Sequence, residues 1–391
     1  MKYDFDKITD RRDTDSIKWD FAVEFGLPAD VLPLWVADMD IPTAPAVTAA
    51  LIERCRHGIF GYSDSKGEYF EAVRSWFSSR HSLELKSDWL VKTSSVVFAL
   101  YNAVRAATEK GDAVLIQPPV YYPFYKAVEE NGRRLVSSEL IFEDGQYRID
   151  FDDFENKIVS ENVKLFILCS PHNPTGRVWT REELERLGDI CAAHSVTVVS
   201  DEIHCDFTLD GYTHVSFLNA CPDMAEHTIL CTAPSKTFNV AGLQCSNIFI
   251  PGDELRESFK REVSLTGFSG INALGLVACR AAYEGGADWL DELLIYLEDN
   301  LGFLRSYLAS ELPEIKLVEP QGTYFAWLDC RALGLSDKEL NDLIVNKAKL
   351  WLDAGNIFGK SGEGFQRVVL ACPRKTLAEA LDRLKRAVRS L

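Results

Sequence analysis

Short runs of aliphatic and β-branched residues alternate with longer amphipathic stretches over most of the chain. The short apolar runs predict buried β-strands, and the longer stretches, with apolar positions three and four residues apart, predict helices. The helix predicted for residues 180–194 opens with Thr180 three residues before Glu183, which is the spacing of a capping box. The predicted strands are residues 113–116, 165–168, 196–200, 229–231 and 247–250.

Alternating strands and helices predict a mostly parallel sheet with helices on both faces, and ligands bind such sheets beyond the carboxyl ends of the strands. Near residue 285 the pattern changes to one long helix, two short strands and a final helix. We therefore predict an α/β protein with a three-layer large domain, residues 46–285, and a smaller α+β domain of residues 286–391. Residues 1–45 are expected to form an arm that packs on the small domain and the mouth of the active site.

The chain's 391 residues carry a formal charge of −17, which disfavours nucleic acid and anionic membranes as partners. Its first residues are charged, unlike a signal peptide, and no apolar run approaches the roughly 20 residues that span a bilayer. The ten cysteines lack the spacing of zinc ligands. These features predict a cytoplasmic protein with buried free thiols and no metal site.

A lysine flanked by small hydroxyl residues, Lys236, follows the strand predicted for residues 229–231. Desolvation at such a place lowers the pKa of an amine and makes it a nucleophile toward aldehydes. An ordinary surface lysine after a strand is the alternative that this segment alone leaves open.

Two further polar residues follow predicted strands. Asp201 comes at the end of residues 196–200, where a buried carboxylate needs a cation such as a pyridinium nitrogen, although aspartate is also a common helix N-cap. Asn173 lies in a loop, residues 169–176, that two prolines and a glycine make rigid. Its amide can donate to a phenolate oxygen, and a plain tight turn is the alternative.

Three other segments carry candidate binding residues. Tyr121 could stack on a planar cofactor, although aromatic side chains usually pack in a core. The N–H groups at the start of the helix predicted for residues 96–108 could bind phosphate, although the hydroxyl residues before it are also routine caps. Arg367 could grip a carboxylate with two parallel hydrogen bonds, and a structural ion pair is the alternative.

The order of these motifs along the chain resembles the class I/II aminotransferases of pyridoxal-phosphate (PLP) fold type I. An Asn-Pro-x-Gly motif is followed by Asp-x-x-His, then by Ser-Lys-Thr and a late arginine. Finer matches resemble the MalY/PatB group of C–S β-lyases, often called cystathionine β-lyases. These matches are residues 34–40, 61–62, 170–174, 200–204, 236–243 and 371–374, and the resemblance spans residues 2–390.

The resemblance implies roles around the cofactor ring. Lys236 would hold PLP as a Schiff base and then move protons, and Asp201 would pair with the pyridine nitrogen. Asn173 would bond the O3′ atom. Tyr121 would stack on the ring and is, with Lys236, an expected catalytic residue.

The resemblance also implies how the phosphate is held. The backbone amides of Val96 and Val97, together with Ser235, would bind the phosphate of the same subunit. Tyr62 would reach the phosphate of the neighbouring subunit, which requires a homodimer with shared active sites.

Three positions depart from the wider aminotransferase pattern. His204 would lie beside the cofactor where a tyrosine commonly donates to O3′, and Gln244 stands where an arginine commonly binds phosphate. Both fit the β-lyase group. Ser95 stands where a glycine is common, which puts the detailed phosphate contacts in doubt.

The resemblance finally implies an amino acid substrate, with Arg367 binding its α-carboxylate beside the backbone of Val36 and Ala37. The expected reaction is α,β-elimination from L-cystathionine or related cysteine S-conjugates to a thiol, pyruvate and ammonia. The same residues support transamination, so an amino acid aminotransferase is the first alternative. A PLP-binding regulatory protein without catalytic activity is the second.

Overall fold

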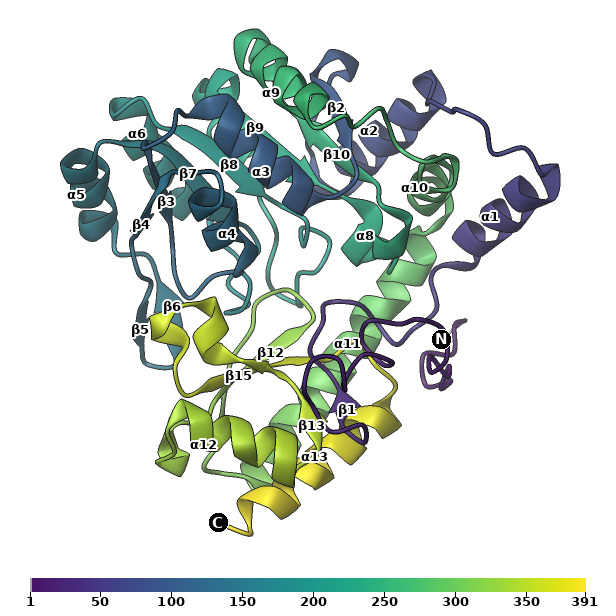
Figure 1. The fold of residues 1–391 in the computed structure, drawn as a ribbon, viewed down its shortest axis with the longest axis vertical. Helices are drawn as coiled ribbons and strands as arrows, with labels where there is room; N and C mark the ends of the chain where they lie inside the picture. The colour runs from purple at the N-terminus through teal and green to yellow at the C-terminus, as the bar shows by residue number, and fades with distance from the viewer. Residues whose placement is uncertain (1) are drawn as a thin grey trace.

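The computed structural model describes residues 2–391, and a seven-stranded sheet forms the core of its upper part (Figure 1). The strand order is β2-β10-β9-β8-β7-β3-β4, in which β10 is antiparallel to both neighbours and the strands from β9 to β4 pair in parallel. The predicted α/β class with a mostly parallel sheet is confirmed, and each strand predicted within this sheet lies within two residues of its observed bounds. The strands are β2 (Leu90–Thr93), β3 (Ala113–Ile116), β4 (Arg134–Ser137), β7 (Val163–Cys169), β8 (Thr197–Asp201), β9 (Thr228–Thr232) and β10 (Ser246–Phe249).

Helices cover both faces of this sheet (Figure 1). The helices of residues 45–285 are α1 (Pro45–His57), α2 (Gly67–His81), α3 (Val96–Ala107), α4 (Pro123–Glu129), α5 (Phe151–Glu161), α6 (Arg181–Ala193), α7 (Phe217–Ala220), α8 (Pro234–Thr237), α9 (Asp253–Leu265) and α10 (Ala273–Gly285). Side chains alternate along β3, so Val114 and Ile116 pack with residues of α3 and α9, whereas Leu115 packs with residues of α5 and α6. The predicted capping box is confirmed at α6, where Thr180 Oγ1 accepts from Glu183 N and the Glu183 carboxylate accepts from Thr180 N.

A smaller antiparallel sheet of order β11-β12-β15-β14 forms the lower part of the molecule, beside two long helices (Figure 1). The large sheet lies within residues 90–249 and the small one within residues 316–369. The division of the chain near residues 45 and 285 remains a prediction. The elements outside the large sheet and its helices are β1 (Leu32–Pro33), β5 (Ile141–Glu143), β6 (Gln146–Arg148), α11 (Ala287–Glu311), β11 (Lys316–Val318), β12 (Phe325–Asp329), α12 (Asp337–Asp342), β13 (Leu350–Trp351), β14 (Asp353–Ala354), β15 (Phe365–Val369) and α13 (Arg374–Val388).

The N-terminal segment crosses to the lower part of the molecule, where β1 pairs in parallel with β13. All ten cysteines are free thiols; nine are buried, as predicted, whereas the prediction of burial is wrong for Cys55, which is exposed on α1. Among residues 2–391, no helix has both the length and the apolar character needed to cross a membrane.

Candidate active site

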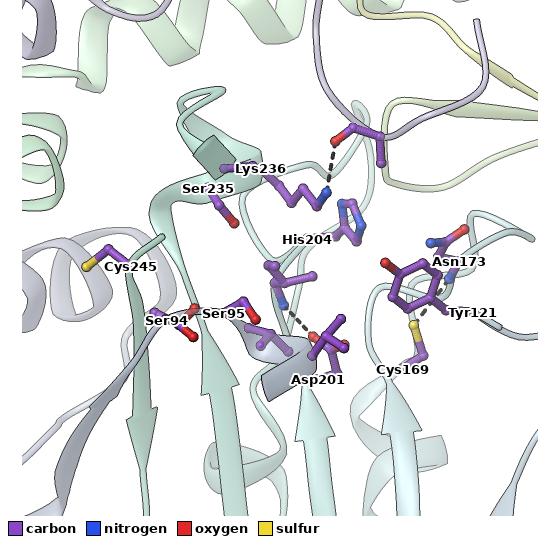
Figure 2. A pocket seen from close by; sticks show the side chains of 16 residues that line it. Ser94, Ser95, Tyr121, Cys169, Asn173, Asp201, His204, Ser235, Lys236 and Cys245 are labelled. Atoms are coloured by element: carbon purple, nitrogen blue, oxygen red, sulfur yellow. Dashed lines mark hydrogen bonds between the residues drawn. The ribbon is translucent and has the colours of Figure 1, made fainter. Parts of the chain in front are cut away.

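A cavity of about 120 Å³ opens beyond the carboxyl ends of β7, β8 and β9 (Figure 2). This is the place where parallel sheets bind ligands, because the loops that follow the strands meet there. Tyr62, Val36 and Arg367 do not line the cavity. The predicted site residues that do are Ala37, Val96, Val97, Tyr121, Asn173, Asp201, His204, Ser235 and Lys236.

Lys236 lies in α8, the short helix after β9, and its Nζ atom donates to the Ala37 carbonyl oxygen at 2.8 Å (Figure 2). Burial, together with the nearby positive charge of Arg367, lowers the pKa of Lys236 to about 8. An amine with this pKa is about half neutral near pH 8, and only the neutral form is a nucleophile or a base. The alternative of an ordinary surface lysine is therefore wrong.

The Ala37 carbonyl belongs to a segment held by four charged side chains. Arg11 lies 2.7 Å from the carboxylate of Asp38 and 2.8 Å from that of Asp40. Lys18, whose side chain is fully buried, lies 2.9 Å from Asp40 and 3.4 Å from Asp38. Each charge in this cluster has an opposite charge beside it, so the segment has one well-defined position. The cluster was not predicted, because its members come from separate parts of an N-terminal region without regular periodicity.

The helix α8 is also supported from the side away from the cavity. The Asp206 carboxylate accepts from Thr237 Oγ1 at 2.7 Å and from Trp76 Nε1 at 3.1 Å, and it hydrogen-bonds His81 Nε2 at 2.8 Å. His81, Cys205 and Asp206 lie close enough to share a metal ion. The Asp206 oxygens already have these donors, so we assign the cluster to the support of α8.

Asp201 ends β8 and is 3% exposed (Figure 2). Its Oδ1 atom accepts from Ile203 N at 3.2 Å. Burial raises the pKa of Asp201 to about 7, because the charged carboxylate has lost its water without gaining a close cation. Turns rather than a helix follow Asp201, so the alternative of a helix N-cap is wrong.

Asn173 is oriented by a contact with Arg367, whose Nη1 atom donates to Asn173 Oδ1 at 2.8 Å. A guanidinium group only donates hydrogen bonds, so the amide oxygen must face Arg367. The amide nitrogen is thereby left as a donor on the cavity side. This is the group predicted to donate to a phenolate oxygen, and the arrangement supports that prediction over a plain turn.

Arg367 lies on β15, behind Asn173, and is 2% exposed. It forms an ion pair with Asp353 of β14, and its Nη2 atom also donates to the Trp35 carbonyl oxygen at 3.0 Å. The guanidinium lies over the Phe325 ring, 4.3 Å from its centroid. The alternative of a structural ion pair is thus present, and binding of a substrate carboxylate by Arg367 stays a prediction.

The N-terminus of α3 faces the end of the cavity that Ser94 and Ser95 line (Figure 2). Ser95 caps the helix, because its Oγ atom accepts from Phe98 N at 3.0 Å. The N–H groups of Val96 and Val97 have no partner within the helix, as is usual in a first turn, and they can bind an anion together with the helix dipole. The Ser95 hydroxyl keeps its own proton to donate, so serine at this position is compatible with phosphate binding.

The side chains of His204 and Tyr121 also line the cavity and bring polar atoms to it (Figure 2). Burial and the positive charges of Lys236 and Arg367 lower the pKa of His204, so its imidazole is neutral. Its Nδ1 atom is buried without a hydrogen-bond partner among residues 2–391. Burial raises the pKa of Tyr121, so its phenol keeps its proton. A buried polar atom without a partner fits a site that awaits a polar ligand.

Tyr62 and Gln244, like Val36 and Arg367, do not line the cavity. Tyr62 is fully exposed, in a surface depression that it shares with Phe60 and residues 269–274. Gln244 is exposed in a left-handed backbone conformation, with φ of 51°. Ala37 but not Val36 contributes to the lining. The exposed position of Tyr62 is compatible with its predicted action on a neighbouring subunit.

The cavity also contains residues that were not predicted as site residues. Cys169 is the last residue of β7, and Ile203 lies two residues after β8. Ser246 is the first residue of β10, and Cys245 immediately precedes it. Because β10 runs antiparallel, its first residues rather than its last come to this edge of the sheet. These residues could not be predicted, because the apolar pattern of β10 does not show in which direction the strand runs.

Comparisons with known proteins agree with this geometry. A family model described as aminotransferase class I and II matches residues 29–384. The chain belongs to this family. Cystathionine beta-lyase PatB of Bacillus subtilis (strain 168) is 46% identical to the chain over 384 residues, covering 98% of the chain and 99% of PatB. Protein MalY of Escherichia coli (strain K12) is 36% identical over 392 residues and the whole of both chains.

A solved structure of the aminotransferase class I and II fold gives the same result. The PLP-bound C–S lyase from Staphylococcus hominis superposes with a TM-score of 0.93 at 36% identity, covering 99% of this chain and 98% of that one. The predicted membership of the MalY/PatB group is confirmed by these relatives together.

The residues of this aminotransferase-family site fit PLP on their own chemistry. Lys236 offers an amine of lowered pKa for the aldehyde, and Asp201 offers a buried acid that lacks a close cation. The start of α3 offers free N–H groups for the phosphate, and Asn173 offers an amide donor. Each part of the cofactor thus has a group of suitable charge or hydrogen-bonding character.

Proposed function

We propose that this chain is a PLP-dependent carbon–sulfur β-lyase that cleaves L-cystathionine or related cysteine S-conjugates to a thiol, pyruvate and ammonia. The observation that carries the proposal is the placement of a desolvated Lys236 and a buried Asp201 in one cavity. Such a site supports several reactions of amino acids. C–S cleavage is selected because the chain is 46% identical, over almost its whole length, to a cystathionine beta-lyase.

PLP in this cavity supplies an electron-poor ring that takes up the negative charge left when a proton leaves the substrate α-carbon. Asp201 would pair with the ring nitrogen and keep it protonated. Asn173 would donate to O3′. The N–H groups of Val96 and Val97, with the Ser235 hydroxyl, would hold the phosphate.

The chain's own side chains then handle the proton and the substrate. Lys236 Nζ, neutral in part at neutral pH, takes the α-proton as general base. Its hydrogen bond to the Ala37 carbonyl fixes the direction of the amine. Arg367 would hold the α-carboxylate and so orient the Cα–H bond toward Lys236. Departure of the thiolate from the β-carbon then commits the reaction to elimination.

The purified holoenzyme is expected to release pyruvate, ammonia and a thiol from L-cystathionine with no keto acid present. Pyruvate can be followed by coupling to lactate dehydrogenase, and the thiol by a disulfide reagent. Turnover that requires an added keto acid and gives no pyruvate would instead assign the chain as an aminotransferase. Binding of PLP with no turnover of any amino acid would leave only a regulatory role.

We also propose that the enzyme is a cytoplasmic homodimer in which Tyr62 completes the partner's phosphate site. Tyr62 is fully exposed, and Ile59 and Phe60 beside it are also more than half exposed. A group of exposed apolar and aromatic side chains on the connection between α1 and α2 favours burial against another protein surface.

Replacing Tyr62 by alanine is expected to weaken PLP binding about 10-fold or more, because a hydrogen bond to a charged group contributes about 1.5–3 kcal/mol. The PLP dissociation constant can be measured from the cofactor absorbance. Tyr212→Ala, which removes another exposed tyrosine, serves as the matched control. A monomer in light scattering, or unchanged PLP affinity in the Tyr62 variant, would contradict the shared site.

A further inference from the structure

Arg367 already holds a carboxylate before any substrate arrives. Asp353 and Arg367 are direct partners in the antiparallel pairing of β14 with β15. Both are almost completely buried, at 6% and 2% exposed, and they form an ion pair. The pair is therefore neutral overall and has little contact with water.

The hydrogen bonds of Arg367 show which of its donors remain. Nη2 donates to Asp353 and to the Trp35 carbonyl oxygen, so both of its N–H groups are used. Nη1 donates to Asn173, and Nε is buried without a partner among residues 2–391. A guanidinium grips a carboxylate bidentately either through Nε and Nη2 or through Nη1 and Nη2. Either grip needs an N–H group that Asp353 or Trp35 now occupies.

A second carboxylate at Arg367 also changes the charge balance. With Asp353 ionised, one guanidinium would face two buried anions, and two carboxylates that share one site cannot both stay ionised at low cost. Burial raises the pKa of Asp353, and the charge of Arg367 opposes this rise. The other ionisable groups facing Asp353 are the phenols of Tyr121 and Tyr122, which precede α4 and keep their protons because their pKa values are raised. Asp353 is therefore the group that can become neutral.

We propose that Asp353 takes up one proton from solvent when the substrate carboxylate binds to Arg367, so that Asp353 acts as a built-in competitor that makes substrate binding depend on pH. The proton adds to an Asp353 carboxylate oxygen, and no other bond is made or broken. Asp353 is then a positioning residue, because it acts on the substrate only through Arg367. This inference rests on the proposed role of Arg367 in binding the α-carboxylate.

The proton uptake can be measured with a carboxylate that cannot react. 3-(Methylthio)propionate carries a thioether and a carboxylate but no amine, so it probes the carboxylate site of the holoenzyme without turnover. Calorimetric titrations at pH 8 in two buffers of different ionisation enthalpy give the number of protons taken up. We expect nearly one proton for the wild type, with the dissociation constant rising up to about 10-fold per pH unit above neutrality.

Two substitutions at Asp353 separate its titration from its shape. Asp353→Asn keeps the size and the hydrogen bond to Arg367, and we expect it to bind the probe with much smaller proton uptake and a flatter pH profile. Asp353→Glu keeps an acid and is expected to restore the uptake. Wild-type binding without proton uptake, or the same uptake in Asp353→Asn, overturns the proposal.

Two further measurements distinguish a failure of the inference about Asp353 from a failure of the role assigned to Arg367. If Asp353→Asn does not fold, infrared difference spectra of the wild type decide, since a band of a protonated carboxylic acid must appear when the probe binds and its absence overturns the proposal. Arg367→Lys tests the underlying assignment, and probe affinity unchanged in that variant would remove Arg367 from the substrate site. Binding that depends on Arg367 but takes up no proton would overturn the inference about Asp353 alone.

Discussion

Replacing Lys236 by alanine lowers kcat for pyruvate release from L-cystathionine by at least about 10³-fold, because the variant loses both the amine that holds the cofactor and the base that takes the α-proton. The cavity around position 236 is built by other residues, among them Asp201, Asn173 and the start of α3. PLP should therefore still bind without a covalent bond. The measurement is kcat from the coupled assay, together with the PLP absorbance of the purified variant.

Lys260→Ala is a matched control for this experiment. Lys260 is exposed on α9 and pairs with Glu257 on the surface, so its removal should leave kcat within about twofold of the wild type. Borohydride treatment followed by peptide mapping gives an independent readout, since it should fix PLP onto Lys236 in the wild type and not in Lys236→Ala. A Lys236→Ala enzyme with wild-type activity would remove Lys236 from the mechanism.

The sheet could be predicted from the sequence where its strands are buried on both faces. β3, β8, β9 and β10 appear as short apolar runs because helices cover both sides of them. The strands at the two edges, β2 and β4, were not predicted, since they carry exposed or half-buried polar residues such as Lys92 and Arg134. Edge strands lack the continuous apolar pattern on which the prediction depends.

The residues of the site could also be predicted in part, where they lie at the ends of buried strands. Asp201 ends β8, and Lys236 lies in the short helix after β9, so the parallel pairing of these two strands brings both residues to one edge of the sheet. The partners that tune them could not be predicted, because they come from distant segments. Asp353 reaches Arg367 through the small sheet, and Lys18, from the N-terminal region, binds Asp38 and Asp40 in the segment that follows Ala37. Tyr62 depends on a second chain, about which one sequence carries no direct signal.

Asp201→Asn is expected to lower kcat about 10²- to 10³-fold with little change in KM, because asparagine cannot supply the negative charge that keeps the ring nitrogen protonated. Asp201 lies at the end of β8 and makes no hydrogen bond or ion pair with Arg367 among residues 2–391, so ground-state binding of the substrate carboxylate should survive. Steady-state kinetics with L-cystathionine measure both constants. Asp210→Asn, which changes an exposed aspartate nine residues further along the chain, is the control. A kcat within a few-fold of the wild type would contradict the pairing of Asp201 with the cofactor.

The same substitution should stabilise the cofactor-free protein, in contrast to its effect on activity. Asp201 has a pKa of about 7 in the folded chain against 3.8 as its ordinary value, so folding becomes less favourable as the pH rises from about 4 to 7 and the buried carboxyl loses its proton. Asparagine has no such proton to lose. The free energy of unfolding of Asp201→Asn should therefore exceed that of the wild type by up to about 4 kcal/mol at pH 8, and this difference should be absent below about pH 4.

Urea unfolding of the cofactor-free proteins at pH 5 and pH 8 tests this sign directly, because the difference between Asp201→Asn and the wild type must be larger at pH 8. With PLP bound, the pyridinium would give the Asp201 carboxylate its missing cation, so the advantage of asparagine should shrink or reverse in the holoenzymes. If the stability difference between Asp201→Asn and the wild type does not change with pH, the Asp201 carboxylate already has a stabilising partner in the cofactor-free protein. A difference that depends on pH but not on PLP would mean that its cation is not the cofactor.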